Sequence, residues 1–158
     1  MFRPYVENSY PGFPRLGIRM ASIEDEVSAW PGIAAEPHRF NGREFTLGAR
    51  EVGHVHGERL LDIPFAKRIR DVLVEEGEAQ EHHVIPESGW ISFRIEGDAD
   101  REHAVWLLRL SYLYNVAILN NQGAADGELD TIDVEQEVAS MDLNEDLSAV
   151  FDSLRTSQ

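Results

Sequence analysis

Short extended segments separated by turn residues occupy the chain between residues 33 and 63, and they constrain the fold more than any other feature. Asn41-Gly42 stands between HRF and REFTL. An Asn-Gly dipeptide in such a setting is the strongest short-range signal of a β-hairpin. We therefore predict a run of antiparallel strands here. Their expected positions are residues 34–40, 43–47, 50–56 and 59–62.

Helical spacing of apolar residues marks the segments on either side of these strands. Ser22 begins a sequence that resembles a capping box, and Pro31-Gly32 ends it, so a short helix is expected between them. Pro64 suits the first turn of a helix, because its missing N–H costs nothing there, and Gly77 is a good stop. These signals predict a second helix over residues 64–76.

Two further helices are expected in the second half of the chain. Residues 100–119 are densely apolar and predict the central core helix, with His103 as a satisfied core or boundary residue. Asn144 is a suitable cap for a shorter amphipathic helix near the C-terminus. The apolar stripe of that helix consists of Leu147, Val150, Phe151 and Leu154.

A second hairpin is predicted where AQEHHVI and WISFRIE flank a turn at residues 86–89. That turn sets three cross-strand pairs, which are Ile85 with Trp90, His83 with Ser92, and Glu81 with Arg94. The face with Ile91, Phe93 and Ile95 should then pack on the helices. The opposite, polar face would carry Glu81, His83, Trp90, Ser92 and Arg94, with Glu81 and Arg94 as an ion pair.

These elements together predict an α+β fold, in which an antiparallel β-sheet built from hairpins has its helices packed mostly on one face. We expect an extended arm at residues 1–20 and the α+β domain at residues 21–120. Residues 121–158 form an acidic C-terminal extension that contains the short amphipathic helix. The other face of the sheet is then left for function.

Composition excludes several classes of protein. The chain has no cysteine, so disulfides, thiolate zinc sites, iron–sulfur clusters and a cysteine nucleophile are impossible. Its first twenty residues lack the apolar run of a signal peptide, and no stretch is long and apolar enough to span a bilayer. We therefore expect a cytoplasmic protein without a membrane partner.

The chain is strongly acidic, with 29 Asp and Glu residues against 14 Lys and Arg residues and a formal net charge of −15. A field of this sign repels phosphate backbones, so we expect no nucleic-acid partner. Residues 121–158 hold ten acidic residues and one basic residue. Two interpretations remain open, namely a halophilic protein kept soluble by carboxylates and an ordinary acidic interaction tail.

Two histidines in the strand at residues 50–56 are the main candidates for chemistry. His54 and His56 lie two residues apart, so they share one face of that strand with Val52 and can chelate a metal ion. His-x-His alone is a weak metal signal, because a competent site needs further ligands. His82 and His83 are strand neighbours with opposite directions, so only one of them could join, and the hairpin pairing favours His83.

Each candidate also has a purely structural interpretation. Strand histidines are more often hydrogen-bonded or solvated side chains than ligands, and Trp90 is as well suited to sheet packing as to holding a substrate. The functional interpretation gains weight from convergence, because histidines, a tryptophan and Arg94 in one cleft would suit a planar anionic or enolic ligand. Histidine also has the right pKa to act as a base near neutral pH.

The ordered motifs PHRFNGREFTLG, EVGHVHGERLLDIPF, HHVIPESGW and HAVWLLRLSYLY resemble the small luciferase-domain family, named for the fungal luciferases, over about residues 22–116. For the fungal members, the resemblance implies an oxygen-dependent oxidation of a hydroxylated pyrone without a cofactor. This chain is shorter than the fungal enzymes, lacks their hydrophobic N-terminal segment and adds its own acidic extension. Carried onto this chain, the motif positions are His54, His56, Asp62, Pro64, His83, Ser88, Gly89 and Trp90.

Two functional hypotheses follow. The first is a cofactor-independent, O2-dependent oxidation of a small planar hydroxylated compound, with catalytic residues His54, His56 and His83. In this hypothesis the substrate is bound by Asp62, Ser88, Trp90 and Arg94, and no metal is required. The second is a non-catalytic module that binds a small ligand or a protein on the same face. Both hypotheses require the three histidines to converge.

Overall fold

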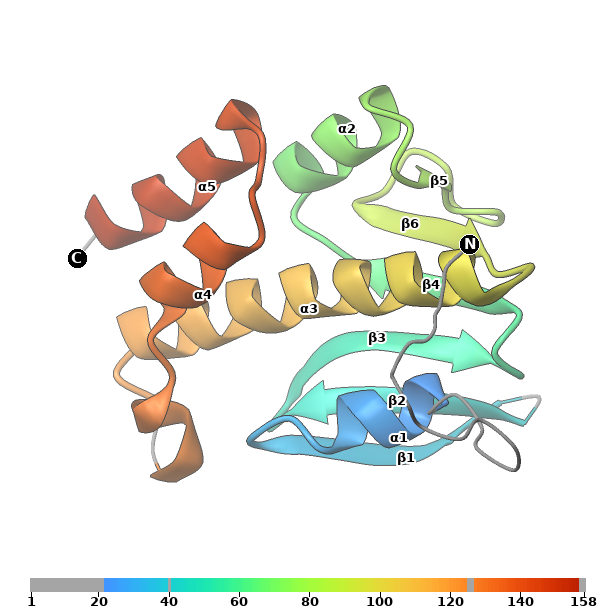
Figure 1. Ribbon diagram of the computed structural model, residues 1–158, viewed down its shortest axis with the longest axis horizontal. Coiled ribbons are helices and arrows are strands. Elements are labelled where there is room, and N and C mark those ends of the chain that lie inside the picture. Colours follow the sequence, from blue (N-terminus) through green and yellow to red (C-terminus); the bar gives the residue numbers. More distant parts are fainter. Residues whose placement is uncertain (1–21, 40, 125–126, 157–158) are drawn as a thin grey trace, which may run out of the picture.

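The computed structural model describes residues 22–39, 41–124 and 127–156, with only the backbone described at residues 155 and 156. Within these ranges, six strands form one antiparallel sheet in the order β1-β2-β3-β4-β6-β5 (Figure 1). The strands are β1 (Ile33–His38), β2 (Gly42–Leu47), β3 (Arg50–His56), β4 (Leu60–Pro64), β5 (Gln80–Glu81) and β6 (Trp90–Arg94). The strands predicted before residue 63 are thus present, and Asn41 adopts a positive φ of 63° in the first turn.

Five α-helices of the described ranges accompany the sheet, and the α+β class is confirmed. They are α1 (Ile23–Ser28), α2 (Lys67–Glu75), α3 (Asp98–Asn121), α4 (Val134–Ser140) and α5 (Glu145–Thr156), with a 3₁₀ helix at Gly127–Thr131. The long helix α3 contacts β3 and β4, and α4 and α5 pack against it (Figure 1). Among the described helices, none is both long and apolar enough to cross a membrane.

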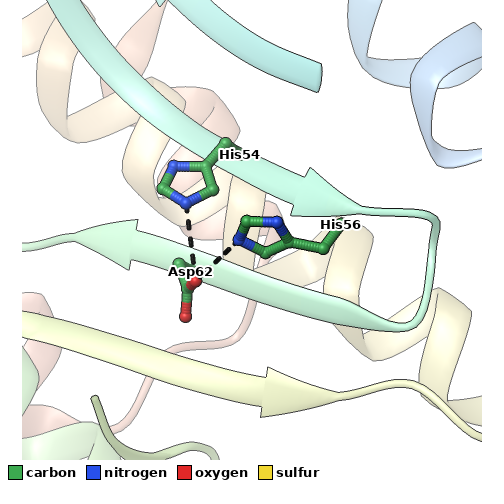
Figure 2. Close-up of side chains that lie close together, drawn as sticks. All are labelled: His54, His56 and Asp62. Carbon is green, nitrogen blue, oxygen red and sulfur yellow. Dashed lines mark hydrogen bonds and ion pairs between the residues drawn. The ribbon is translucent and has the colours of Figure 1, made fainter. Parts of the chain in front are cut away.

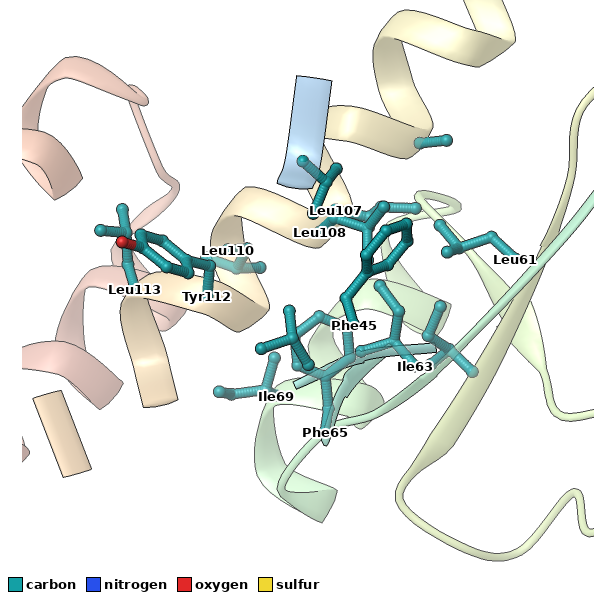
Figure 3. Packing of buried hydrophobic residues seen from close by; sticks show 14 of the residues in the cluster. Phe45, Leu61, Ile63, Phe65, Ile69, Leu107, Leu108, Leu110, Tyr112 and Leu113 are labelled. Carbon is teal, nitrogen blue, oxygen red and sulfur yellow. The ribbon is translucent and has the colours of Figure 1, made fainter. Parts of the chain in front are cut away.

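The core lies between α3 and one face of the sheet. Phe45, Leu61 and Ile63 point from the sheet toward Leu107 and Leu108 of α3, and all five are fully buried (Figure 3). The approach is closest at Gly53 of β3, where an added Cβ atom would lie 2.8 Å from Leu108 Cδ2. Since successive strand residues alternate between faces, this packing leaves the flanking His54 on the opposite face.

The acidic C-terminal segment contributes to the same core. As predicted, Asn144 caps the last helix, because its Oδ1 atom accepts a hydrogen bond of 2.8 Å from the Leu147 N–H. The predicted apolar stripe of α5 is buried, with its four side chains between 3% and 8% exposed. Acidic residues therefore line the outside of a helix whose inner face packs against α2 and α3.

A β-bulge in β3 corrects one sequence expectation. The β2–β3 register pairs Phe45 with Gly53 and Thr46 with Glu51, so Val52 is the extra residue. Val52 is fully buried instead of sharing a face with the histidines. The inserted residue also brings Glu51 onto the face of His54, although residues three apart in a regular strand lie on opposite faces.

The helix predicted to begin at Pro64 begins three residues later. Pro64 is the last residue of β4, where it pairs with Trp90 of β6, and α2 starts at Lys67. Phe65 continues the pairing, because its N–H donates to the carbonyl of Gly89. Pairing with β6 thus keeps Pro64 and Phe65 extended, and the helix starts only after them. The fixed φ of proline is compatible with the end of a strand as well as with the first turn of a helix.

The register predicted for the second hairpin is also wrong. β5 has only two residues, with Gln80 opposite Ser92 and Glu81 opposite Ile91, and residues 82–89 form a loop. Two side chains hold this loop away from the sheet ladder. The His82 ring accepts hydrogen bonds from the N–H groups of residues 84 and 85, and Arg70 of α2 binds Glu81 and the Pro86 carbonyl. Glu81 therefore pairs with Arg70 and not with Arg94.

Gly89 provides a test of this arrangement. A Cβ atom at Gly89 would lie 2.2 Å from the Phe65 carbonyl oxygen, a backbone atom that is fixed by the strand pairing. We expect Gly89→Ala to lower the free energy of unfolding by about 1–3 kcal/mol or more, as overpacking does. Urea denaturation measures this change. The matched control is Gly97→Ala, since nothing lies within 4 Å of a Cβ atom there; equal stability of the two variants would contradict the close approach.

Candidate functional site

A buried carboxylate lies at the centre of the polar face of the sheet. Asp62 of β4 is only 1% exposed, and it stands between His54 on β3 and Ser92 on β6 in one cross-strand row. The Ser92 hydroxyl donates a hydrogen bond of 2.6 Å to Asp62 Oδ1. Because a buried charge is costly unless it is paired, the surroundings of Asp62 must compensate it.

Three imidazole rings converge on the other oxygen of Asp62. The Nε2 atoms of His54, His56 and His83 lie 3.4, 3.2 and 3.3 Å from Asp62 Oδ2. Figure 2 shows His54 and His56 reaching from the neighbouring strand toward Asp62. His83 arrives from the loop after β5, where its N–H donates to Ser92 Oγ at 3.3 Å. The three histidines named from the sequence therefore do meet.

His54 is the most enclosed of these rings, and carboxylates flank both of its nitrogens. Its Nδ1 atom lies 2.6 Å from Glu51 Oε2, a contact that the β-bulge makes possible. Burial alone would lower the pKa of His54, but the bonds to Asp62 and Glu51 outweigh it and raise this pKa to about 9. For Asp62, burial acts against ionisation, yet hydrogen bonds from His54 and Ser92 hold its pKa well below the usual range.

His82 also reaches Asp62, which corrects the expectation that only one of the adjacent histidines can join. Its Nε2 atom lies 3.6 Å from Asp62 Oδ1, and its Nδ1 atom accepts from two backbone N–H groups. A neutral ring that accepts at Nδ1 carries its hydrogen on Nε2. Burial and the neighbouring histidines lower the pKa of His82 despite Asp62, in agreement with this neutral form.

His38 of β1 completes the group and was not identified from the sequence. Its ring stacks on that of His54 with centroids 4.1 Å apart, and its Nδ1 atom lies 3.0 Å from Glu44 Oε1. The sequence signal that could have identified His38 is the register of the Asn41 hairpin. This register places His38 and His56 in one cross-strand row, on either side of Gly42. We use the name histidine cluster for His38, His54, His56, His82, His83 and Asp62.

The remaining predicted residues differ in their relation to the histidine cluster. The ring centroid of Trp90 lies 5.6 Å from those of both His54 and His82, so this side chain borders the cluster. Ser88 accepts from the Trp90 N–H and donates to the Ile85 carbonyl, which are contacts within the loop. Arg94 is exposed and shares the cross-strand row of His56. His103 lies elsewhere, bonded to the Glu78 carbonyl as expected for a satisfied boundary residue.

The histidine cluster is open to solvent on one side. The side chain of His83 is 43% exposed and that of His56 is 27% exposed, whereas His54 is 9% exposed. A hollow of about 340 Å³ between α3, α4 and α5 contains none of these residues. Chemistry-bearing side chains gather on the sheet face and not in that hollow, so we take the histidine cluster as the candidate site.

Fold and site together define an α+β protein whose sheet presents histidines around a buried aspartate. Residues 49–111 match the family model described as Luciferase domain. This confirms the resemblance seen in the sequence over these residues, so this part of the chain is similar to the luciferase domain. The match begins after β2, so His38 and Glu44 lie outside it. No curated protein and no solved structure matches the chain.

The charge pattern around His54 gives a pH prediction for protein freed of metal with EDTA. Since the folded pKa of about 9 exceeds the ordinary 6.5, the His54 imidazolium stabilises the fold below pH 6.5, and this stabilisation is lost as the pH rises through 9.

Asp62→Asn removes one neighbouring anion and should lower the pKa of His54 by about 1 to 3. Histidine ring titrations by NMR measure it, with His103 as internal control. An unchanged pKa would contradict the pairing.

Proposed function

We propose that this protein catalyses an O2-dependent oxidation of a small, planar, hydroxylated compound, such as a pyrone or another enol, at the histidine cluster. The observation that carries the proposal is the convergence of three imidazole Nε2 atoms within 3.4 Å of one buried carboxylate oxygen. Imidazole accepts and returns protons near neutral pH, and a fixed carboxylate stabilises the imidazolium that forms. The luciferase-domain match supports the same class of reaction.

The exposure of the rings indicates which of them act on the substrate in the proposed reaction. His56 and His83 are the rings that a substrate can reach, because they are more exposed than His54. One of them takes the proton of the substrate hydroxyl, which leaves an electron-rich enolate. The enolate carbon then forms a bond to O2, and the resulting peroxide takes the proton back. Because the enolate supplies the electrons, the reaction as proposed uses no redox cofactor.

Two further side chains suit a planar, acidic substrate. Trp90 borders the rings of His54 and His82 and offers an aromatic surface for a flat molecule. Arg94 is exposed in the row of His56, where its guanidinium can pair with an anionic oxygen. Both groups would hold the substrate over the histidines, which is a positioning contribution and not a chemical step.

A non-catalytic binding module is the second candidate. The observation that favours it is the open surface of the histidine cluster, since enzymes that protect a reactive enolate generally enclose it. His56 and His83 would then serve only to hold a ligand or partner. Both candidates use the same residues, so only turnover separates them.

Oxygen consumption with a panel of hydroxypyrones and polyphenols tests the proposal. We expect uptake by the wild type and a decrease of at least about a hundredfold in His56→Ala/His83→Ala, the scale of general-base catalysis. His103→Gln is the matched control, because this histidine lies outside the cluster, and it should retain activity. Ligands that raise the melting temperature without any oxygen uptake would support the binding module and overturn the oxidation.

A further inference from the structure

We propose that His54, His56, His83 and Asp62 bind one divalent transition-metal ion with tetrahedral coordination, for which Zn²⁺ is the best-matched probe. Two groups of potential ligand atoms share Asp62, each with its atoms within 4.8 Å of one another: His54, His56 and Asp62 form the first, and Asp62, His82 and His83 form the second. Imidazole nitrogen and carboxylate oxygen are the donors that such ions take in proteins. The inference uses the residues of the proposed function but does not rest on the oxidation.

The three distances from Asp62 Oδ2 match edges of a coordination tetrahedron. Bonds of 2.0–2.1 Å to a central ion place neighbouring ligand atoms about 3.3–3.4 Å apart. The three distances from Asp62 Oδ2 to the Nε2 atoms are 3.2, 3.3 and 3.4 Å. Charge-assisted hydrogen bonds between such groups are normally shorter, at about 2.7–2.9 Å. The spacing is thus wide for direct bonds and suitable for an ion between the atoms.

The number of rings supports the same conclusion. One carboxylate oxygen offers two lone pairs, yet three imidazole nitrogens are directed at Asp62 Oδ2. If each ring were protonated at Nε2, the three donors would compete for two positions. If the rings presented lone pairs, nitrogen and oxygen lone pairs would face each other. A bound cation satisfies all four atoms once the exposed His83 ring turns toward His54 and His56.

Surrounding groups fix the orientation that metal binding needs. Glu51 lies 2.6 Å from the Nδ1 atom of His54, so it can hold the hydrogen there and leave Nε2 free as a ligand. This carboxylate–histidine arrangement is frequent around protein-bound zinc. Ser92 occupies Asp62 Oδ1, which leaves Oδ2 as a single ligand atom. The formal charge of −15 further attracts cations to the protein.

His82 is not part of the proposed ligand set, although it is adjacent to His83. Its Nδ1 atom accepts hydrogen bonds of 3.1 and 3.2 Å from backbone N–H groups, so the neutral ring carries its hydrogen on Nε2. That N–H points at Asp62 Oδ1 and has no lone pair for a metal. Two neighbouring histidines therefore have opposite expected roles, which gives the proposal its sharpest test.

A bound ion would alter the proposed reaction without removing its site. Rings that bind a metal cannot accept a proton, so a substrate hydroxyl bound to the ion would give its proton to solvent water at the open side of the cluster. The exposed side of His83 is where such a ligand would enter. Metal binding is measured on the protein alone, so its failure leaves the metal-free oxidation intact, and failure of the oxidation leaves metal binding intact.

The experiment uses the full chain stripped with EDTA and titrated with Zn²⁺ by calorimetry. We expect one ion per chain, and a tetrahedral visible spectrum when Co²⁺ replaces Zn²⁺. Loss of a ligand should exceed the 10–100-fold effect of losing a supporting group, so His83→Asn should weaken binding by more than about a hundredfold. His82→Asn should weaken it by no more than the 10–100-fold of a supporting group, since asparagine can also accept from the following backbone N–H groups.

A second measurement uses the wild type, so its result does not depend on whether the variants fold. In the wild type, ¹⁵N NMR of the histidine rings should show Zn²⁺-dependent shifts at Nε2 of His54, His56 and His83, with His82 Nε2 remaining protonated. Glu51→Gln should weaken Zn²⁺ binding by about 10–100-fold. Absence of stoichiometric Zn²⁺ or Co²⁺ binding, or equal effects of His83→Asn and His82→Asn, would overturn the proposal.

Discussion

The burial of one carboxylate within the sheet organises the polar half of this protein. Asp62 lies in the middle of β4, where water cannot solvate it, and such a charge costs several kcal/mol unless partners surround it. Ser92 satisfies one oxygen and three histidines gather at the other. The opposite face of the same strand packs on α3, so one face of β4 belongs to the apolar core and the other to the histidine cluster.

Two departures from regular sheet structure complete this arrangement. The bulge at Val52 brings Glu51 to the side of His54, where a regular strand would turn it toward the core. The loop after β5 brings both His82 and His83 to Asp62, where a regular hairpin would turn one of them away. Arg70 of α2 holds that loop at its start through Glu81 and at its middle through the Pro86 carbonyl. Both irregularities serve the histidine cluster.

Much of the fold was predictable from local patterns. The Asn41 hairpin appears where its Asn-Gly dipeptide placed it, and the strand at residues 50–56 and the apolar helix near residue 100 appear where periodicity placed them. Part of the site was predictable too, because alternation put His54 and His56 on one face and the luciferase-domain resemblance added Asp62. The errors at Pro64 and in the second hairpin share a cause, since long-range pairing with β6 decided both segments.

The sequence by itself determined the α+β class and the histidine pair of β3, because these follow from side-chain alternation and helical spacing within single segments. It also excluded cysteine chemistry outright. Only the tertiary structure decided that His82 and His83 reach the buried Asp62, that His38 stacks on His54, and that Glu51 supports His54. Those contacts join β1, β3, β4 and the loop before β6, and they depend on strand order, a bulge and a loop whose geometry no short stretch of sequence encodes.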